Sequence, residues 1–345
     1  MDAFLRMSDS ERRLICEQAQ AVLGLPPAAV EKDFWVCWTL QRLFNLPDWG
    51  GRLTFKGGTS LAKAWRLIER FSEDIDMVID RDFLGFGGPE SPEKAPSKKK
   101  QKQRLESLKE TCRERIGFGL KPLLEQSFRE ALPTGSQWSL NIASIEEDPD
   151  RQTLLFKYPE TLTGNSRYLR AVVKIELGAR SDTWPVESSR IQPYLADAFP
   201  NLMGPSDFTV RVVASERTFW EKVMLLHEET FRPTQKPRKA RLSRHYYDLW
   251  CLIRKGVADR AIQNSLLFTG VAEHRSVFFS QNWMDYNTLR QGSLRLIPLD
   301  AHMAEWRQDY QVMRGEMFFG EAPDFDEILR VVGDFERKFN QGGPS

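Results

Sequence analysis

Residues 53–79 of this chain read LTFKGGTSLAKAWRLIERFSEDIDMVI, and this stretch decides the fold. The first four residues are typical of a short strand, which the two glycines end. The hydroxyl residues at 59 and 60 are good helix starters, so we expect a helix from there to about residue 69. Residues 75–79 are apolar and partly β-branched, as in a buried strand. The stretch therefore predicts a strand, a glycine turn, a helix and a second strand in direct succession.

Two carboxylates, Asp74 and Asp76, stand at the start of the second strand. Side chains at i and i+2 of a strand share a face, about 6 to 7 Å apart, so the two carboxylates point the same way. Such a pair suits Mg²⁺, whose octahedral shell is completed by waters and substrate phosphates. Metal ions held in this way stabilise the in-line displacement of nucleotidyl transfer. Surface turns also produce Asp-x-Asp pairs, and the nearby glycine turn favours the catalytic interpretation.

The glycine turn itself predicts a phosphate-binding element. Gly57 and Gly58 allow the backbone to approach phosphate oxygens, while Thr59 and Ser60 offer hydroxyls and amides at the positive end of a helix. A plain strand-to-helix turn is the alternative.

A third carboxylate, Glu176, lies in the β-branched segment 171–177, which we expect to form a strand beside Asp74 and Asp76. Lys174 shares its face and is placed to offset carboxylate charge or to contact substrate. The alternative is an ordinary strand in which apolar and polar residues alternate and one face is exposed to solvent.

The composition indicates an ordinary soluble protein. Hydrophobic residues make up 41% and charged residues 28% of the 345 residues, which argues against disorder. The 49 Lys and Arg nearly balance the 48 Asp and Glu, so any nucleic-acid binding must come from local patches. The four cysteines lack metal-site spacing and predict free thiols. With no signal sequence and no long apolar run, we expect a cytoplasmic protein that has no membrane segment.

The order of elements predicts an α+β fold in three parts. Residues 1–50 form a helical lead-in, with helices over 11–23 and 29–44, that packs on the core. Residues 51–207 form the core, with a mobile basic insertion at 85–104, a helix over 103–132 and a hinge between 180 and 207. Residues 208–345 form a C-terminal helical domain. Further strands are predicted at 137–145, 153–158, 168–177 and 208–213, and C-terminal helices at 216–229, 244–255, 259–267, 286–290, 302–313 and 325–340.

The helical part supplies three candidate site residues. Lys222 offers a point charge that can neutralise phosphate oxygens as pyrophosphate leaves. Asp248 is placed to orient Lys222 or to accept a proton from the attacking hydroxyl, and an interhelical ion pair is the alternative. His245 is either a base or a histidine packed between helices.

Two basic stretches are candidates for RNA contact. One is the lysine-rich run 98–104, which is either a solvated helix face or a phosphate contact. The other is a proline-rich basic loop near the predicted active site, which we favour for holding an RNA backbone over an ordinary solvated loop. Its cations are Arg232, Lys236, Arg238, Lys239, Arg241 and Arg244.

The motifs resemble those of the AbiEii/AbiGii-type toxin nucleotidyltransferases of bacterial abortive-infection and type IV toxin–antitoxin systems. The resemblance rests on Lys56-Gly57-Gly58-Thr59-Ser60-Leu61 and Arg70-Phe71-Ser72-Glu73-Asp74-Ile75-Asp76. It extends to Glu31-Lys32-Asp33-Phe34, to Glu216-Arg217-Thr218-Phe219-Trp220-Glu221-Lys222 and to Ser243-Arg244-His245-Tyr246-Tyr247-Asp248-Leu249. Together the matches span residues 30 to 250 in family order.

The resemblance implies a polymerase-β-like core with a mixed sheet, followed by a helical domain. It implies Asp74 and Asp76 as catalytic metal ligands, with Glu176 as a third, and Lys222 and Asp248 as further catalytic residues. The implied nucleotide-binding residues are Gly57, Gly58, Thr59, Ser60, Ser72 and Lys222. Mg²⁺ is the implied cofactor, an NTP the substrate, a tRNA 3′ end the acceptor and an antitoxin protein the partner. The alternatives are nucleotidyl or phosphoryl transfer to a protein hydroxyl, or an interaction module without turnover.

Overall fold

The computed structural model of the chain describes residues 1–162, 169–318 and 321–342. The chain forms two compact units. The first comprises Met1–Trp65 and Phe71–Val212, and the second comprises Arg66–Arg70 and Val213–Ser345. Among the described residues, every helix is too short or too polar to span a lipid bilayer. The four cysteines are buried free thiols, as expected from their spacing.

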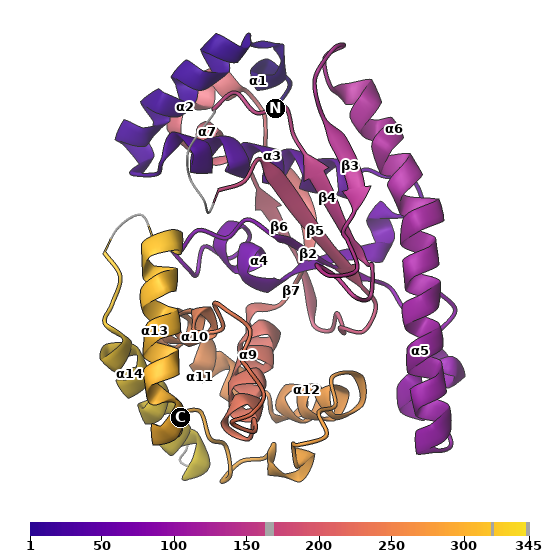
Figure 1. The fold of residues 1–345 in the computed structure, drawn as a ribbon, viewed down its shortest axis with the longest axis vertical. Coiled ribbons are helices and arrows are strands. Elements are labelled where there is room, and N and C mark those ends of the chain that lie inside the picture. The colour runs from indigo at the N-terminus through magenta and orange to yellow at the C-terminus, as the bar shows by residue number, and fades with distance from the viewer. Residues whose placement is uncertain (163–168, 319–320, 343–345) are drawn as a thin grey trace. The chain divides into compact units, whose positions relative to one another are not determined.

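The first unit contains a seven-stranded mixed sheet (Figure 1). Its strands are β1 (Leu53–Lys56), β2 (Ile75–Ile79), β3 (Ser139–Ile142), β4 (Thr153–Lys157), β5 (Val172–Gly178), β6 (Val186–Ile191) and β7 (Phe208–Val213). They lie in the order β3-β4-β5-β2-β1-β7-β6. β1 pairs antiparallel with β2 and parallel with β7, β2 pairs parallel with β5, and β4 pairs antiparallel with β3 and β5. The mixed sheet confirms the predicted α+β class.

Helices complete this unit, and Figure 1 shows α5, η4 and α6 following one another in a long rod. The helices are α1 (Asp2–Arg6), α2 (Asp9–Leu23), α3 (Pro27–Phe44), α4 (Gly57–Lys63), α5 (Lys98–Glu114), α6 (Lys121–Ala131), α7 (Tyr194–Ala198) and α8 (Pro200–Met203). Shorter turns are η1 (Gly50–Arg52), η2 (Gly88–Glu90) and η3 (Pro92–Lys94), and η4 (Arg115–Leu120) is a π-helical segment.

The predicted aromatic lead-in helix is α3, and it is part of the core. Trp35 and Trp38 are fully buried, and their rings lie 5.9 and 5.7 Å from the ring of Phe156 on β4. Trp38 also contacts Phe128 of α6 at 4.7 Å. Aromatic pairs at such distances add to the free energy gained from burying their area, so α3 is fixed on the sheet.

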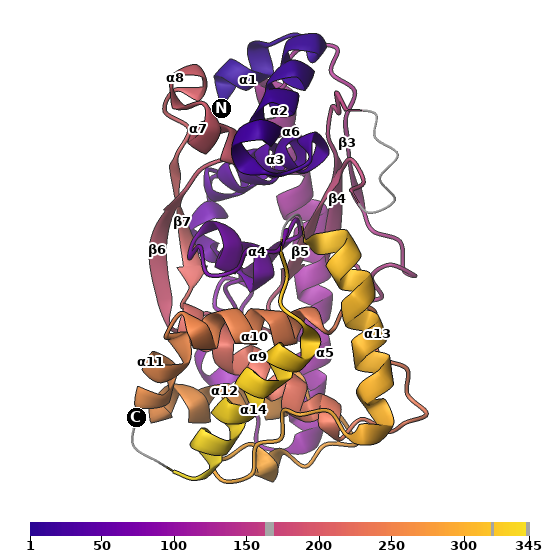
Figure 2. The same ribbon diagram turned by 90° about the vertical axis from the view of Figure 1, so that its left-hand side faces the viewer.

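The second unit is helical, as predicted. Its elements are α9 (Ser215–Thr230), α10 (Arg244–Arg254), α11 (Val257–Gln263), α12 (Ser265–Phe278), η5 (Tyr286–Thr288), α13 (Asp300–Met317) and α14 (Phe325–Asn340). Helix α10 packs against α9 and α14, which Figure 2 shows side by side with it. The predicted single helix 259–267 is wrong, because the side chain of Asn264 accepts a hydrogen bond from the amide of Leu267 and starts α12.

Two other predictions differ from the structure in the first unit. The helix expected to reach residue 69 ends at Lys63, and Arg66 has a left-handed φ of 53° that interrupts any helix. The helix expected over 103–132 begins earlier, at Lys98, where the side chain of Ser97 accepts from the amide of Lys100.

The region 180–207, expected to be an irregular hinge, contains β6. This strand takes the edge of the sheet beside β7, and most of its residues are exposed. An exposed edge strand shows no apolar alternation, so its sequence resembles a loop. β7 belongs to the same sheet, and the compact units divide between Val212 and Val213, the last two residues of this strand.

Candidate active site

Strand register brings three charged side chains into one row across the centre of the sheet. Lys56 on β1 is the partner of Asp76 on β2, and Asp76 is the partner of Glu176 on β5. Paired residues on neighbouring strands have side chains on the same face. The structure thus places Glu176 beside Asp76, where the sequence analysis expected a third carboxylate.

The turn after β1 must be glycine because of Asp76. Gly57 has a left-handed φ of 79°, and a Cβ atom on it would lie 2.0 Å from Oδ2 of Asp76. Any side chain here would collide with the carboxylate and strain the backbone. The glycine therefore lets the start of α4 and the Asp76 carboxylate share the same small space.

The two neighbouring carboxylates repel each other. Burial of Asp76, together with the negative charge of Glu176, raises the pKa of Asp76 to about 7. The nearby ammonium group of Lys56 acts in the opposite direction and lowers the pKa of Asp76. Lys174 forms an ion pair with Glu176, and the ammonium group of Lys56 donates to Oγ of Ser181 at 2.8 Å.

This pair fits a divalent cation. Mg²⁺ usually takes only one or two protein carboxylates and fills its other positions with waters and substrate phosphates. Among the described residues, no group of three or more His, Cys, Asp or Glu side chains is close enough to enclose a metal ion alone. Asp76 and Glu176 are the two carboxylates that strand register brings side by side here, and Asp74 adds negative charge that raises the pKa of Asp76.

The hydroxyl groups of the glycine motif are turned into the protein. Oγ1 of Thr59 lies 2.9 Å from Oγ of Ser72 and donates to the main-chain oxygen of Asp74. Oγ of Ser60 donates to the main-chain oxygen of Gly57 at 2.9 Å, and Ser60 is fully buried. These hydroxyls join the turn to the segment that carries Asp74, so in this structure they position the site.

Helix α3 is joined by buried ion pairs to the segment that carries Asp74 and to α4. The sequence analysis did not assign these ion pairs to the site. The ammonium of Lys32 lies 2.7 Å from Glu73, next to Asp74. Asp33 pairs with Lys63 of α4 at 2.7 Å and accepts from the amide of Tyr194 at 2.6 Å. The charged residues Lys32 and Asp33 in an otherwise apolar helix could have indicated these ion pairs, because buried charges require partners of opposite charge.

In the second unit, Asp248 is the centre of a buried charge cluster. It is fully buried, and its Oδ2 lies 2.8 Å from the ammonium of Lys222. Arg70 binds both carboxylate oxygens, at 2.7 and 2.9 Å. Burial alone would raise the pKa of Asp248, but the two cations hold it well below its usual range. An ionised carboxylate of this kind is a poor proton acceptor, so the geometry favours the orienting role.

His245 lies beside this cluster, with Nδ1 3.3 Å from the ammonium of Lys222. Burial and the charges of Lys222 and Arg244 lower the pKa of His245 well below its ordinary value. Its imidazole is therefore neutral near pH 7 and lies on α10 facing Lys222 of α9.

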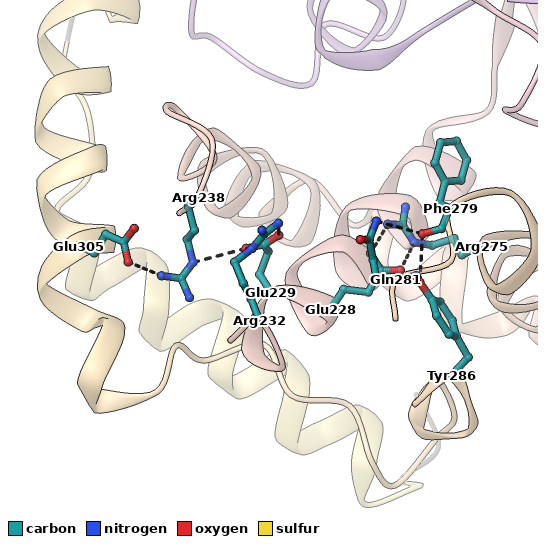
Figure 3. Close-up of polar contacts among 9 residues, drawn as sticks. All are labelled: Glu228, Glu229, Arg232, Arg238, Arg275, Phe279, Gln281, Tyr286 and Glu305. Carbon is teal, nitrogen blue, oxygen red and sulfur yellow. Dashed lines mark hydrogen bonds and ion pairs between the residues drawn. The ribbon is translucent and has the colours of Figure 1, made fainter. Parts of the chain in front are cut away.

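Half of the six cations of the basic loop after α9 are paired with carboxylates inside the unit, as Figure 3 shows for Arg232 and Arg238. Arg232 binds both oxygens of Glu229 at 2.6 Å, and Arg238 pairs with Glu229 and Glu305. Arg241 pairs with Glu316 at 2.8 Å. Lys236 is exposed over the ring of Trp283 at 4.1 Å, and Lys239 is exposed. The loop after α9 therefore has fewer unpaired positive charges available to contact RNA than its sequence suggests.

The raised pKa of Asp76 predicts a pH-dependent effect of Asp76→Asn. In the folded wild type Asp76 holds a proton up to about pH 7, whereas an unfolded Asp releases it near 3.8, so ionisation costs stability as pH rises through this window. Without metal, the stability of the variant relative to wild type should increase between about pH 4 and pH 7 and then level off. Urea unfolding in EDTA measures this, and added Mg²⁺ should stabilise only the wild type. A pH-independent difference would contradict it.

The buried cluster predicts that Asp248→Asn is strongly destabilising. The change leaves Arg70 and Lys222 buried without a counter-charge, which costs about 3–5 kcal/mol of unfolding free energy. The matched control is Asp259→Asn, whose exposed pair with Lys338 at 3.4 Å should contribute less than about 1 kcal/mol. Urea unfolding of both variants at pH 7 makes the comparison, and equal losses would refute the buried pairing.

A family model and several solved structures match this chain. Residues 38–331 match the family model described as nucleotidyl transferase AbiEii toxin, type IV toxin–antitoxin system. Similar solved structures include MenT4, a nucleotidyltransferase toxin from Mycobacterium tuberculosis H37Rv, at 21% identity, TM-score 0.46 and coverage of 96% of both chains. Another is JHP933 from Helicobacter pylori, at 15% identity, TM-score 0.41 and 90% of both chains. No curated protein sequence matches the chain. Because the family model spans most of the chain, this protein belongs to the AbiEii nucleotidyltransferase toxins of type IV toxin–antitoxin systems.

Proposed function

We propose that this nucleotidyltransferase toxin moves a nucleoside monophosphate from a Mg²⁺-bound NTP to the 3′ end of a tRNA. The observation that carries the proposal is the row of Lys56, Asp76 and Glu176 beside the Gly57 turn. Two carboxylates that repel each other at a glycine turn are costly to the fold, and a cation with phosphate ligands relieves that cost.

Asp76 and Glu176 are the proposed protein ligands of Mg²⁺, with Asp74 adding negative charge or a further ligand. When bound, the metal neutralises the triphosphate and activates the attacking hydroxyl. That hydroxyl, the 3′-OH of the acceptor, forms a bond to the α-phosphorus, and pyrophosphate leaves with the electrons of the broken bond. Lys174 balances part of the carboxylate charge through its ion pair with Glu176.

Gly57, Gly58, Thr59, Ser60 and Ser72 remain the proposed nucleotide-binding residues. In this proposal the glycines give the phosphates access to the backbone, and the three hydroxyl residues hold the turn in place. Lys222 contacts the triphosphate, and Asp248 and Arg70 fix the position of its ammonium group. Asp248 is thus a positioning residue.

A tRNA modified at its 3′ end cannot be aminoacylated, so the proposed reaction would arrest translation and growth. A toxin of this kind requires a cognate antitoxin protein in the same cell, and the reaction would take place in the cytoplasm, where tRNA is charged. Transfer to a protein hydroxyl is the competing outcome that the experiment must separate.

The test incubates the purified protein with Mg²⁺, each α-³²P-labelled NTP in turn, and total bacterial tRNA. Label should enter tRNA with the wild type and fall at least about a hundredfold with Asp76→Asn or Glu176→Gln, because each removes a charged metal ligand. The Asp74→Ala, Asp76→Ala double variant should be inactive.

Asp259→Asn, on the surface of the second unit, is the control and should label tRNA like the wild type. Removal of Mg²⁺ with EDTA should abolish labelling. Label on protein, or labelling that survives loss of both carboxylates while the variants stay folded, would overturn the proposal.

A further inference from the structure

We propose that five lysines around the start of α5 form the surface that binds the phosphate backbone of the RNA acceptor; this rests on the proposed function, in which the acceptor is RNA. The lysines are Lys94, Lys98, Lys99, Lys100 and Lys102, named here the lysine platform. It lies in the segment expected to be a mobile insertion, and it competes with the loop after α9 for the same role.

All five side chains are exposed. Over the part of the chain that the structure describes, no carboxylate lies within ion-pair distance of them, and the nearby carboxylates are already paired. Glu90 pairs with Arg104 at 3.3 Å and Glu93 with Arg81 at 3.8 Å. The platform therefore presents about five uncompensated positive charges within a short segment, whereas three of the six cations of the loop after α9 are bound to carboxylates of their own unit.

These charges oppose the stability of the helix that carries them. Ser97 caps α5, and its first turn contains Lys98, Lys99 and Lys100 with no acidic residue. Cations at a helix N-terminus face the positive end of the helix dipole, and like charges at i and i+4, as in Lys98 and Lys102, repel each other. Lys98 and Lys100 donate hydrogen bonds to the neutral side chains of Gln101 and Gln103, which leaves their charge uncompensated, so an external anion is the partner that explains the arrangement.

Hydrogen bonds and an ion pair fix the segment that precedes the lysine platform in place. Nη1 of Arg104 donates to the main-chain oxygens of Pro89 and Ser91 at 2.7 and 3.0 Å. Arg81, which follows the catalytic strand β2, pairs with Glu93 of η3. The segment is thus fixed to α5 and to the end of β2, which keeps its charges in one array.

The chemistry of the platform fits a polyphosphate backbone better than a protein. Among the described residues, no large hydrophobic side chain is exposed between 94 and 102; the next along the chain is Phe118. Protein interfaces depend on buried aromatic or apolar anchors, whereas phosphate contacts need only closely spaced cations and release counterions. Five lysines without an apolar anchor therefore indicate sequence-independent RNA binding.

The test measures the affinity of the full chain for total bacterial tRNA between 50 and 200 mM salt, with all five platform lysines changed to Gln. Affinity at 100 mM salt should fall at least about tenfold, and the slope of log K against log salt should shrink by about 0.7 to 0.9 per lysine that contacts a phosphate. Binding of Mg²⁺·NTP without RNA should be unchanged. The midpoint temperature of thermal unfolding of the five-lysine variant should equal or exceed that of the wild type. The substitutions remove the unfavourable interaction of the lysines with the helix dipole and their mutual repulsion.

Two control variants carry other exposed cations. Arg6→Gln, Arg129→Gln, Lys157→Gln removes cations from the same unit, and Lys236→Gln, Lys239→Gln tests the loop after α9. Each control variant should bind tRNA with an affinity within about twofold of the wild type, and this result would support the lysine platform. Unchanged tRNA affinity in the five-lysine variant overturns the proposal. The same holds if the variant loses affinity only for anionic vesicles or for an acidic protein and still binds tRNA like the wild type. Wild type that binds tRNA with the expected salt slope but never labels it would refute the proposed function and leave the platform standing.

Discussion

The structure of the site depends on two carboxylates that face each other across β2 and β5. Asp76 and Glu176 are register partners in the middle of the sheet, and burial of Asp76 together with the charge of Glu176 raises the pKa of Asp76 to about 7. Two features make the pair possible. Gly57 leaves room for the Asp76 carboxylate, and Lys174 balances part of the charge on Glu176. The repulsion between the two carboxylates is the physical argument for the cation and phosphate ligands that we propose at this place.

Buried ion pairs fix the surroundings of each charged group in both units. In the first unit, α3 anchors α4 through Asp33 and Lys63, and the Asp74 segment through Lys32 and Glu73. In the second unit, Asp248 holds Lys222 in a single position with the help of Arg70. Desolvated pairs of this kind add little net stability, but they are costly to break on one side. They therefore restrict the chemical groups to one geometry, which catalysis requires.

Local pattern predicted the central elements well and long-range pairing poorly. The bounds of β1, β2 and β7 agree with prediction because apolar residues and sharp turn signals mark them in the sequence. The polar edge strand β6 carries no such mark. Asp248 was a candidate from the motif, but its partner Arg70 lies 178 residues away, and only the fold brings them together. Likewise, the sequence alone did not reveal that Glu229, Glu305 and Glu316 pair with three of the six cations of the loop after α9.

The most direct test of the central claim is the location of the metal. Crystals of the full chain grown with Mn²⁺ and a non-hydrolysable NTP should show an anomalous peak coordinated by Asp76 and Glu176, with phosphate oxygens completing the shell. The peak should be lost in Asp76→Asn. A metal bound elsewhere with the nucleotide in place, or an ordered triphosphate with no metal at these carboxylates, would contradict the account.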